Sequence, residues 1–136
     1  MTVIVCLSDG GGMLFGGRRN SRDKAVLADI AKICDGGALF VGSISESLFS
    51  ESDASVISVS DPLASAGEGD FAFIEDRHLS LHKDKITELV IYRWNRKYPF
   101  DFGIDIEPED IGLSLAESFD FKGNAHDKIT REIWRK

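Results

Sequence analysis

The sequence predicts an α/β domain with a mainly parallel central sheet, and three observations support this fold class. Residues 3–7 form a short, β-branched apolar run, which is typical of a strand buried on both faces. Residues 38–41 form a second such run. The segment between them is long enough for a crossover helix, so we expect the two strands to be parallel, in a right-handed βαβ unit. The chain ends in two segments that favour an antiparallel hairpin.

A glycine-rich loop follows the first expected strand. Residues 8–17 contain five of the thirteen glycines, so the backbone of this loop can approach a bound ligand closely. The loop matches neither G-x-G-x-x-G nor a Walker loop, because Gly12 stands nine positions before Ser21. We therefore keep two interpretations, a ligand contact at a helix N-terminus or a loop that only turns the chain.

The first helix is expected to begin near Ser21. This serine is the expected N-cap, and Asp23 falls in the first turn, where the helix dipole stabilises a carboxylate. Val26, Ile30 and Ile33 recur at the spacing of a buried helix face. A pair of glycines after the last of these residues is expected to end the helix.

The rest of the chain is expected to form two short helices, four further strands and the C-terminal hairpin. Ser43 and Glu46 form an S-x-x-E capping box, which predicts a second helix. Residues 77–85 are expected to make at most a short helix. The further expected strands are residues 55–60, 71–74, 88–92, 100–106 as an outer strand, and 113–121 and 125–134 as the hairpin.

Composition predicts a single cytoplasmic domain spanning residues 1–136. The content of 43% hydrophobic residues is enough for one core, and no apolar run approaches the ~18 residues of a membrane span. No basic n-region precedes the first strand. Cys6 and Cys34 are expected to be free thiols in a reducing compartment. We expect a monomer or homodimer with a small-molecule or nucleotide ligand, and the net charge of −7 argues against nucleic-acid binding.

Two basic clusters are expected at the carboxyl ends of the parallel strands, where open α/β sheets bind their ligands. The clusters contain seven of the sixteen basic residues, namely Arg18, Arg19, Arg22 and Lys24 near the first helix and Arg93, Arg96 and Lys97 after residues 88–92. They either face one anion-binding cleft or are two solvated charge runs.

Metal and serine-nucleophile motifs are absent from the sequence. His78 and His82 are spaced i, i+4 but lack the glutamate of H-E-x-x-H, so no metal ligands are expected among the three histidines. No G-x-S-x-G elbow supports Ser-His-Asp catalysis. Asp23 is the candidate catalytic carboxylate, with an ordinary first-turn acid as the alternative.

The order of elements resembles the dihydrofolate reductase family over almost the entire chain, as a divergent and shortened member. The glycine loop with Met13 looks like the family's mobile substrate loop, and Asp23 matches its substrate-binding acid. Residues 38–48 are similar to the strand, glycine and capped helix that carry its G-R-x-T motif, and residues 113–134 resemble its C-terminal hairpin. Residues 88–98 look like its fifth strand and glycine triplet. The resemblance implies a three-layer fold with NADPH or NADH as cofactor.

The resemblance also implies roles for individual residues. Asp23 would orient a substrate ring and promote its protonation while hydride arrives from the cofactor. The implied substrate contacts are Met13, Phe15, Arg18 and Arg19. The implied cofactor contacts are Gly42, Ser43, Ser45, Ser60, Arg93, Trp94, Asn95 and Arg96.

The departures from this family fall on its ligand contacts. Arg93, Trp94 and Asn95 stand where the family has three glycines, and Ser43 stands where it has an arginine. Residues 50–55 offer no base for a folate carboxylate, which argues against folate as substrate. The sequence also has a weak likeness to small bacterial proteins labelled ribonuclease Z. It lacks the H-x-H-x-D-H metal motif of that enzyme, so this label is not supported.

Two functions therefore remain open. The first is an NAD(P)H-dependent reductase of a small pterin-like or heterocyclic substrate. The second is a non-catalytic protein of the same fold that has lost reductase activity and holds a nucleotide or another phosphorylated ligand between basic and aromatic side chains.

Overall fold

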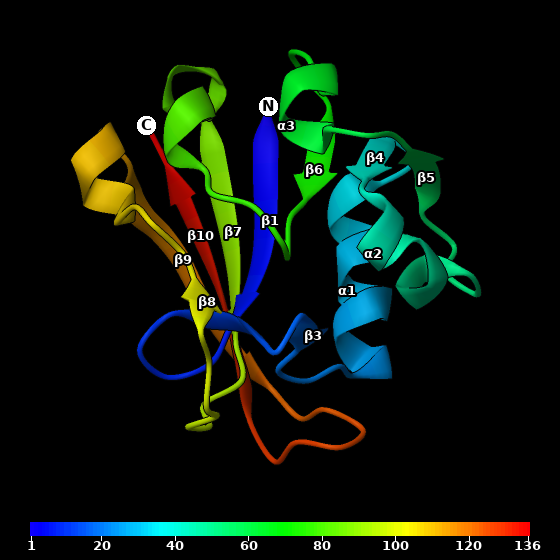
Figure 1. The fold of residues 1–136 in the computed structure, drawn as a ribbon, viewed down its shortest axis with the longest axis vertical. Coiled ribbons are helices and arrows are strands. Elements are labelled where there is room, and N and C mark those ends of the chain that lie inside the picture. Colours follow the sequence, from blue (N-terminus) through cyan, green and yellow to red (C-terminus); the bar gives the residue numbers. More distant parts are fainter.

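A seven-stranded sheet lies at the centre of the computed structural model, which describes residues 1–136 (Figure 1). Its strand order is β5-β4-β6-β1-β7-β10-β9. The strands are β1 (Thr2–Leu7), β4 (Ala38–Val41), β5 (Ser55–Ser58), β6 (Phe71–Phe73), β7 (Glu88–Arg93), β9 (Ser114–Phe121) and β10 (Ile129–Arg135). Only β10 runs against its two neighbours, β7 and β9. The predicted parallel sheet with an antiparallel C-terminal hairpin is confirmed.

A second, three-stranded sheet forms below the carboxyl end of β1 (Figure 1). It contains β2 (Gly12–Phe15), β3 (Arg18–Arg19) and β8 (Phe102–Gly103), all antiparallel. Much of the expected glycine loop is thus paired strand. The expected outer strand at residues 100–106 is wrong, because only β8 forms and it pairs with β2. A Cβ on Gly12 would overlap the ring of Phe100, so this glycine lets the two segments pack closely.

Helix α1 (Lys24–Cys34) begins later than predicted. Asp23, not Ser21, is its N-cap: the Asp23 backbone is extended and its carboxylate accepts a hydrogen bond from the Ala25 amide at 2.9 Å. Val26, Ile30 and Cys34 are buried against the sheet, as the spacing indicated for the first two. Asp35 ends the helix in the left-handed region, with φ of 44°, and Gly36 follows it in the same region.

The remaining helices are single turns or short 3₁₀ segments. They are α2 (Ser43–Glu46), η1 (Ser47–Phe49), α3 (Pro62–Ser65), η2 (Ser80–Lys85) and η3 (Pro108–Ile111). The capping box predicted at Ser43 and Glu46 does not form, because Gly42 is the N-cap of α2 and Ser43 is already helical. The short helix expected before β7 is present as η2.

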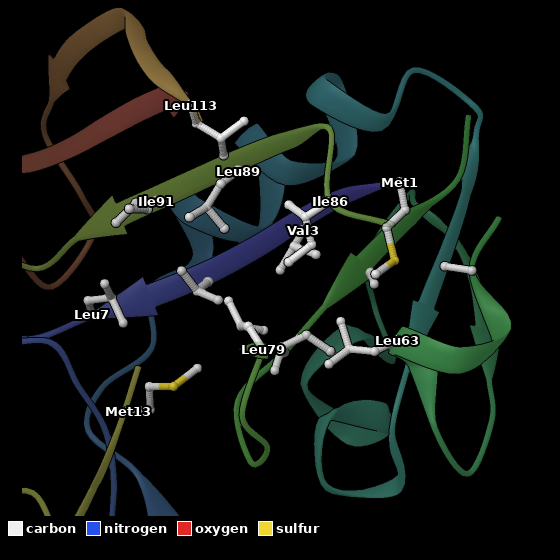
Figure 2. Packing of buried hydrophobic residues seen from close by; sticks show 14 of the residues in the cluster. Met1, Val3, Leu7, Met13, Leu63, Leu79, Ile86, Leu89, Ile91 and Leu113 are labelled. Atoms are coloured by element: carbon white, nitrogen blue, oxygen red, sulfur yellow. The ribbon is translucent and has the colours of Figure 1, made fainter. Parts of the chain in front are cut away.

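Apolar side chains cover both faces of the sheet, so the molecule has three layers. Figure 2 shows Val3 and Leu7 of β1 with Ile91 of β7, and Leu63 and Leu79 packing against this face. On the opposite face, Ile4, Val90 and Tyr92 pack with the buried residues of α1. No helix has the length and apolar character needed to cross a membrane.

Candidate functional site

The carboxylate of Asp23 is surrounded by donors from the turn between β9 and β10. The Asn124 and Ala125 amides donate to it at 2.9 and 2.8 Å, in addition to Ala25, and His126 Nδ1 lies 2.9 Å from Oδ2. Burial alone would raise the pKa of Asp23, but the hydrogen bonds from His126 and the three amides lower it to about 2. The side chain is fully buried. Asp23 therefore stays ionised and joins the start of α1 to the C-terminal hairpin.

His126 continues this network to Ser21. Because Nδ1 faces an ionised carboxylate, it carries a proton, and Nε2 lies 2.9 Å from the Ser21 Oγ, within hydrogen-bond distance. The imidazole stacks on the buried indole of Trp94 with the ring centres 4.7 Å apart. The Tyr98 hydroxyl lies farther from Nε2, at 3.5 Å. Asp23, His126 and Ser21 thus form one continuous hydrogen-bonded chain.

Arg19 of β3 lies at the carboxyl ends of β4, β6 and β1, where it contacts the segments that follow β4 and β6. Its Nε and Nη2 donate to the two carboxylate oxygens of Glu75 at 2.8 and 3.0 Å, and Nη2 also donates to the Ile44 carbonyl. Ser45 Oγ donates to the same carboxylate at 2.6 Å. The hydrogen bond to Glu75 raises the pKa of Arg19. Such a bidentate pair is geometrically specific and strong.

Little room remains beside this ion pair. The cavity there has a volume of about 10 Å³, roughly the space of one water molecule. Burial, followed by the nearby Glu75 carboxylate, raises the pKa of the Cys6 thiol, so Cys6 is un-ionised and a poor nucleophile. The cavity is lined by Cys6, Met13, Arg19, Asn20, Ser21, Glu75 and Trp94.

A large open groove lies between α1, residues 47–53 and the turn of the C-terminal hairpin. Its volume is about 1030 Å³, and its apolar lining includes Leu27 and Leu48. Arg22 and Lys24 are exposed on one side and Asp53 on the other, and none of the three is in an ion pair. The groove can therefore take a ligand with an anionic group and hydrogen-bond donors.

Comparisons with known proteins give a likeness in structure alone. No family model and no curated protein matches the sequence. Among 224 matching chains of solved structures is dihydrofolate reductase from Enterococcus faecalis, complexed with NADP(H) and RAB-propyl. It superposes with a TM-score of 0.68, covering 99% of this chain and 95% of that one. The fold is that of dihydrofolate reductase. The sequences are 9% identical, so the likeness concerns the fold.

Within this dihydrofolate reductase fold, the predicted cofactor residues separate into two groups. Gly42, Ser43 and Ser45 follow β4, whereas Arg93 to Arg96 end or follow β7. Strands β6 and β1 lie between β4 and β7, which places the groups about 14 Å apart at the usual strand spacing. Residues 93–95, expected at the glycine-triplet position, therefore do not lie beside Gly42, because β6 is the strand next to β4.

The three residues that replace the glycines bind the protein itself. Arg93 Nε donates to Glu132 of β10 at 2.9 Å, and Trp94 is buried under His126. Asn95 adopts a positive φ of 57° and its side-chain amide donates to Thr130 Oγ1 at 2.9 Å. The basic and aromatic cleft expected here does not form, since these side chains anchor β7 to β10.

The two basic clusters do not share one cleft. From the first cluster, Arg22 and Lys24 line the large groove, Arg19 is paired with Glu75, and Arg18 is exposed on β3. From the second, Arg96 is exposed, and its carbonyl accepts a hydrogen bond from the Asp9 amide. The expected single cleft is therefore wrong.

The other predicted contacts also lie apart. Met13 is buried beside Leu7, as Figure 2 shows, and Phe15 is exposed on β2. Gly42 is covered by the guanidinium of Arg77, which donates to the Ser60 carbonyl at 3.0 Å and to Asp61 at 3.2 Å. Sequence reasoning missed Ser21, Glu75, Arg77 and His126 as parts of these networks, because their partners are distant in the sequence.

Proposed function

We propose that this chain is a small-molecule-binding protein with the fold of dihydrofolate reductase, and that it performs no hydride transfer from a nicotinamide cofactor. The observation that carries the proposal is the Arg19–Glu75 ion pair at the carboxyl ends of β1 and β6. In open α/β sheets this end of the strands is the usual ligand crevice. Here the chain's own side chains occupy it, and about 10 Å³ is too small for an aromatic ring.

The Asp23 environment supports the same proposal. A carboxylate that binds a substrate ring must offer it a free oxygen, but three backbone amides and His126 already use both oxygens of Asp23. Of the residues expected to hold NADPH or NADH, Arg93 likewise donates to Glu132 and Asn95 to Thr130. These residues do not fit a nicotinamide cofactor, and we assign it no step.

The large groove is the proposed ligand site. Its volume of about 1030 Å³ lies in the range of small-molecule sites, and it combines an apolar lining with polar side chains at the rim. Arg22 and Lys24 would hold an anionic group such as a phosphate. Asp53 on the opposite side would accept hydrogen bonds from the amino groups of a base. A mononucleotide has both kinds of group, so it is the proposed class of ligand.

Calorimetric titration with adenosine monophosphate and with inorganic phosphate tests this assignment. Arg22→Ala should weaken nucleotide binding roughly ten- to a hundredfold, because one charge-assisted contact contributes about 1.5–3 kcal/mol. Arg93→Ala is the matched control, because Arg93 is paired with Glu132 and lies outside the groove. Nucleotide binding that depends on Arg93 and not on Arg22 would overturn the proposed site.

A nicotinamide-dependent reductase is the second candidate. It is favoured by one observation, that the superposed reductase carries NADP(H) in its complex. NADPH also carries an adenosine nucleotide, so Arg22→Ala separates the two candidates. NADPH binding that is unchanged in Arg22→Ala would support this candidate, whereas nucleotide binding that is weakened in Arg22→Ala would support the groove.

A further inference from the structure

The hydrogen-bonded chain of Ser21, His126 and Asp23 has the order of a nucleophile, a base and an orienting acid. Ser21 Oγ lies 2.9 Å from Nε2 of the imidazole, and Nδ1 lies 2.9 Å from the carboxylate. The carboxylate and imidazole are buried, while Ser21 is partly exposed and lines the small cavity. Ser21 is thus the member of the three with the greatest exposure to solvent. Triads are recognised by such geometry, not by sequence position.

The geometry points to Ser21 as a nucleophile activated by His126 and Asp23, for attack on a carboxylic ester. This activity goes beyond the proposed binding function and does not depend on it. Asp23 lines the large groove, but the reacting Ser21 and the base His126 do not. The geometry provides both features that activation needs: a base within hydrogen-bond reach, and a third group that orients the base.

Three further features distinguish this arrangement from a hydrogen bond on the protein surface. Stacking on the buried Trp94 fixes the plane of the imidazole. His126 is the only hydrogen-bond partner of the Ser21 hydroxyl. The backbone N–H groups of Ser21 and Arg22 have no acceptor within the protein.

A purely structural role explains less of the arrangement. The Asn124 and Ala125 amides already attach the hairpin turn to Asp23, and the Ala25 amide already caps α1. The Ser21 hydroxyl adds no further segment to this junction.

The reaction needs only the ester and water. As Ser21 Oγ forms a bond to the carbonyl carbon, its proton passes to His126 Nε2, and the ionised Asp23 pairs with the imidazolium. The ester C–O bond then breaks, and the leaving alcohol takes the proton from Nε2. Water attacks the acyl-serine by the same route, which releases the acid and restores Ser21.

A fluorophosphonate probe tests the nucleophile directly, since Oγ displaces fluoride from phosphorus in the same kind of step. We expect the intact chain to be labelled once, at Ser21, as located by peptide mass spectrometry. His126→Asn and Asp23→Asn should slow labelling by about a hundredfold or more. The matched control is Ser118→Ala on β9, an exposed serine that makes no hydrogen bond to this network, and this variant should be labelled at the wild-type rate.

Labelling of the wild type remains a usable readout if a variant fails to fold. Failure to label Ser21 in the wild type, or a labelling rate at Ser21 that is insensitive to both substitutions, would overturn the proposal. Loss of labelling with nucleotide binding intact would leave the proposed binding function standing.

Discussion

Arg19 and Glu75 lie 56 residues apart in the sequence and meet in a bidentate ion pair between β1 and β6. The Glu75 side chain is 8% exposed and that of Arg19 is 23% exposed, so the pair is largely removed from solvent. The hydroxyl of Ser45 completes the coordination of the carboxylate. The ion pair thus joins β3 directly to the segment that follows β6.

Removal of the Glu75 carboxylate should destabilise the protein strongly. Glu75→Ala leaves the Arg19 guanidinium and the Ser45 hydroxyl without their partner in a partly buried position, which should cost about 3 kcal/mol. Urea denaturation measures the change. Glu88→Ala is the control, because its partner Arg135 is more than half exposed and exposed pairs contribute less than about 1 kcal/mol. Equal losses in the two variants would contradict the account.

Acid should weaken the protein through Asp23. The folded pKa of about 2 is lower than the ordinary 3.8, so this carboxylate stabilises the folded state above about pH 4, and the contribution is lost as the pH falls towards 2. The difference corresponds to about 2 kcal/mol. Asp61 and Asp105 also have lowered pKa values, so the comparison is made with Asp23→Asn in the same background. Urea denaturation near pH 5 and near pH 2 should show a smaller acid loss in Asp23→Asn; identical losses would remove Asp23 as a cause.

Gly123 should not tolerate a side chain. A Cβ there would overlap the Asp23 carboxylate and lie 2.7 Å from Ile129 Cδ1, and the carboxylate cannot move without losing its amide donors. We expect Gly123→Ala to cost about 1–3 kcal/mol in unfolding experiments. Gly67→Ala is a suitable control, because the nearest atom to its Cβ would be at 3.6 Å. A neutral Gly123→Ala would show that the turn does not pack against Asp23 in this way.

The main strands and α1 were predictable because each has a pattern of apolar residues within its own segment of the sequence. The apolar runs at β1, β4 and β7 and the spacing of Val26 and Ile30 are set by burial, which leaves a periodic signal in the sequence. The caps were less predictable. Ser21 and Asp23 are both good N-cap residues, and the choice of Asp23 depends on donors from the turn around residue 124, about a hundred positions away.

The site networks carry no local signal. Ser21 and His126 are 105 residues apart, and they meet only because β10 inserts between β7 and β9 and brings its preceding turn to the start of α1. The same applies to Arg93 and Trp94, whose types suggested a ligand surface. Their roles depend on Glu132 and His126, which the sequence does not place beside them.

The most direct measurement of the central claim is a calorimetric titration of the intact chain with NADPH, followed by an assay of NADPH oxidation. Because the Arg19–Glu75 pair occupies the carboxyl ends of the strands, we predict no NADPH oxidation by the wild type. Adenosine monophosphate should bind in the groove, and both this ligand and NADPH, which carries the same nucleotide unit, should lose affinity in Arg22→Ala. Saturable NADPH binding that is unchanged in Arg22→Ala would contradict the account and identify the chain as a nicotinamide-binding protein.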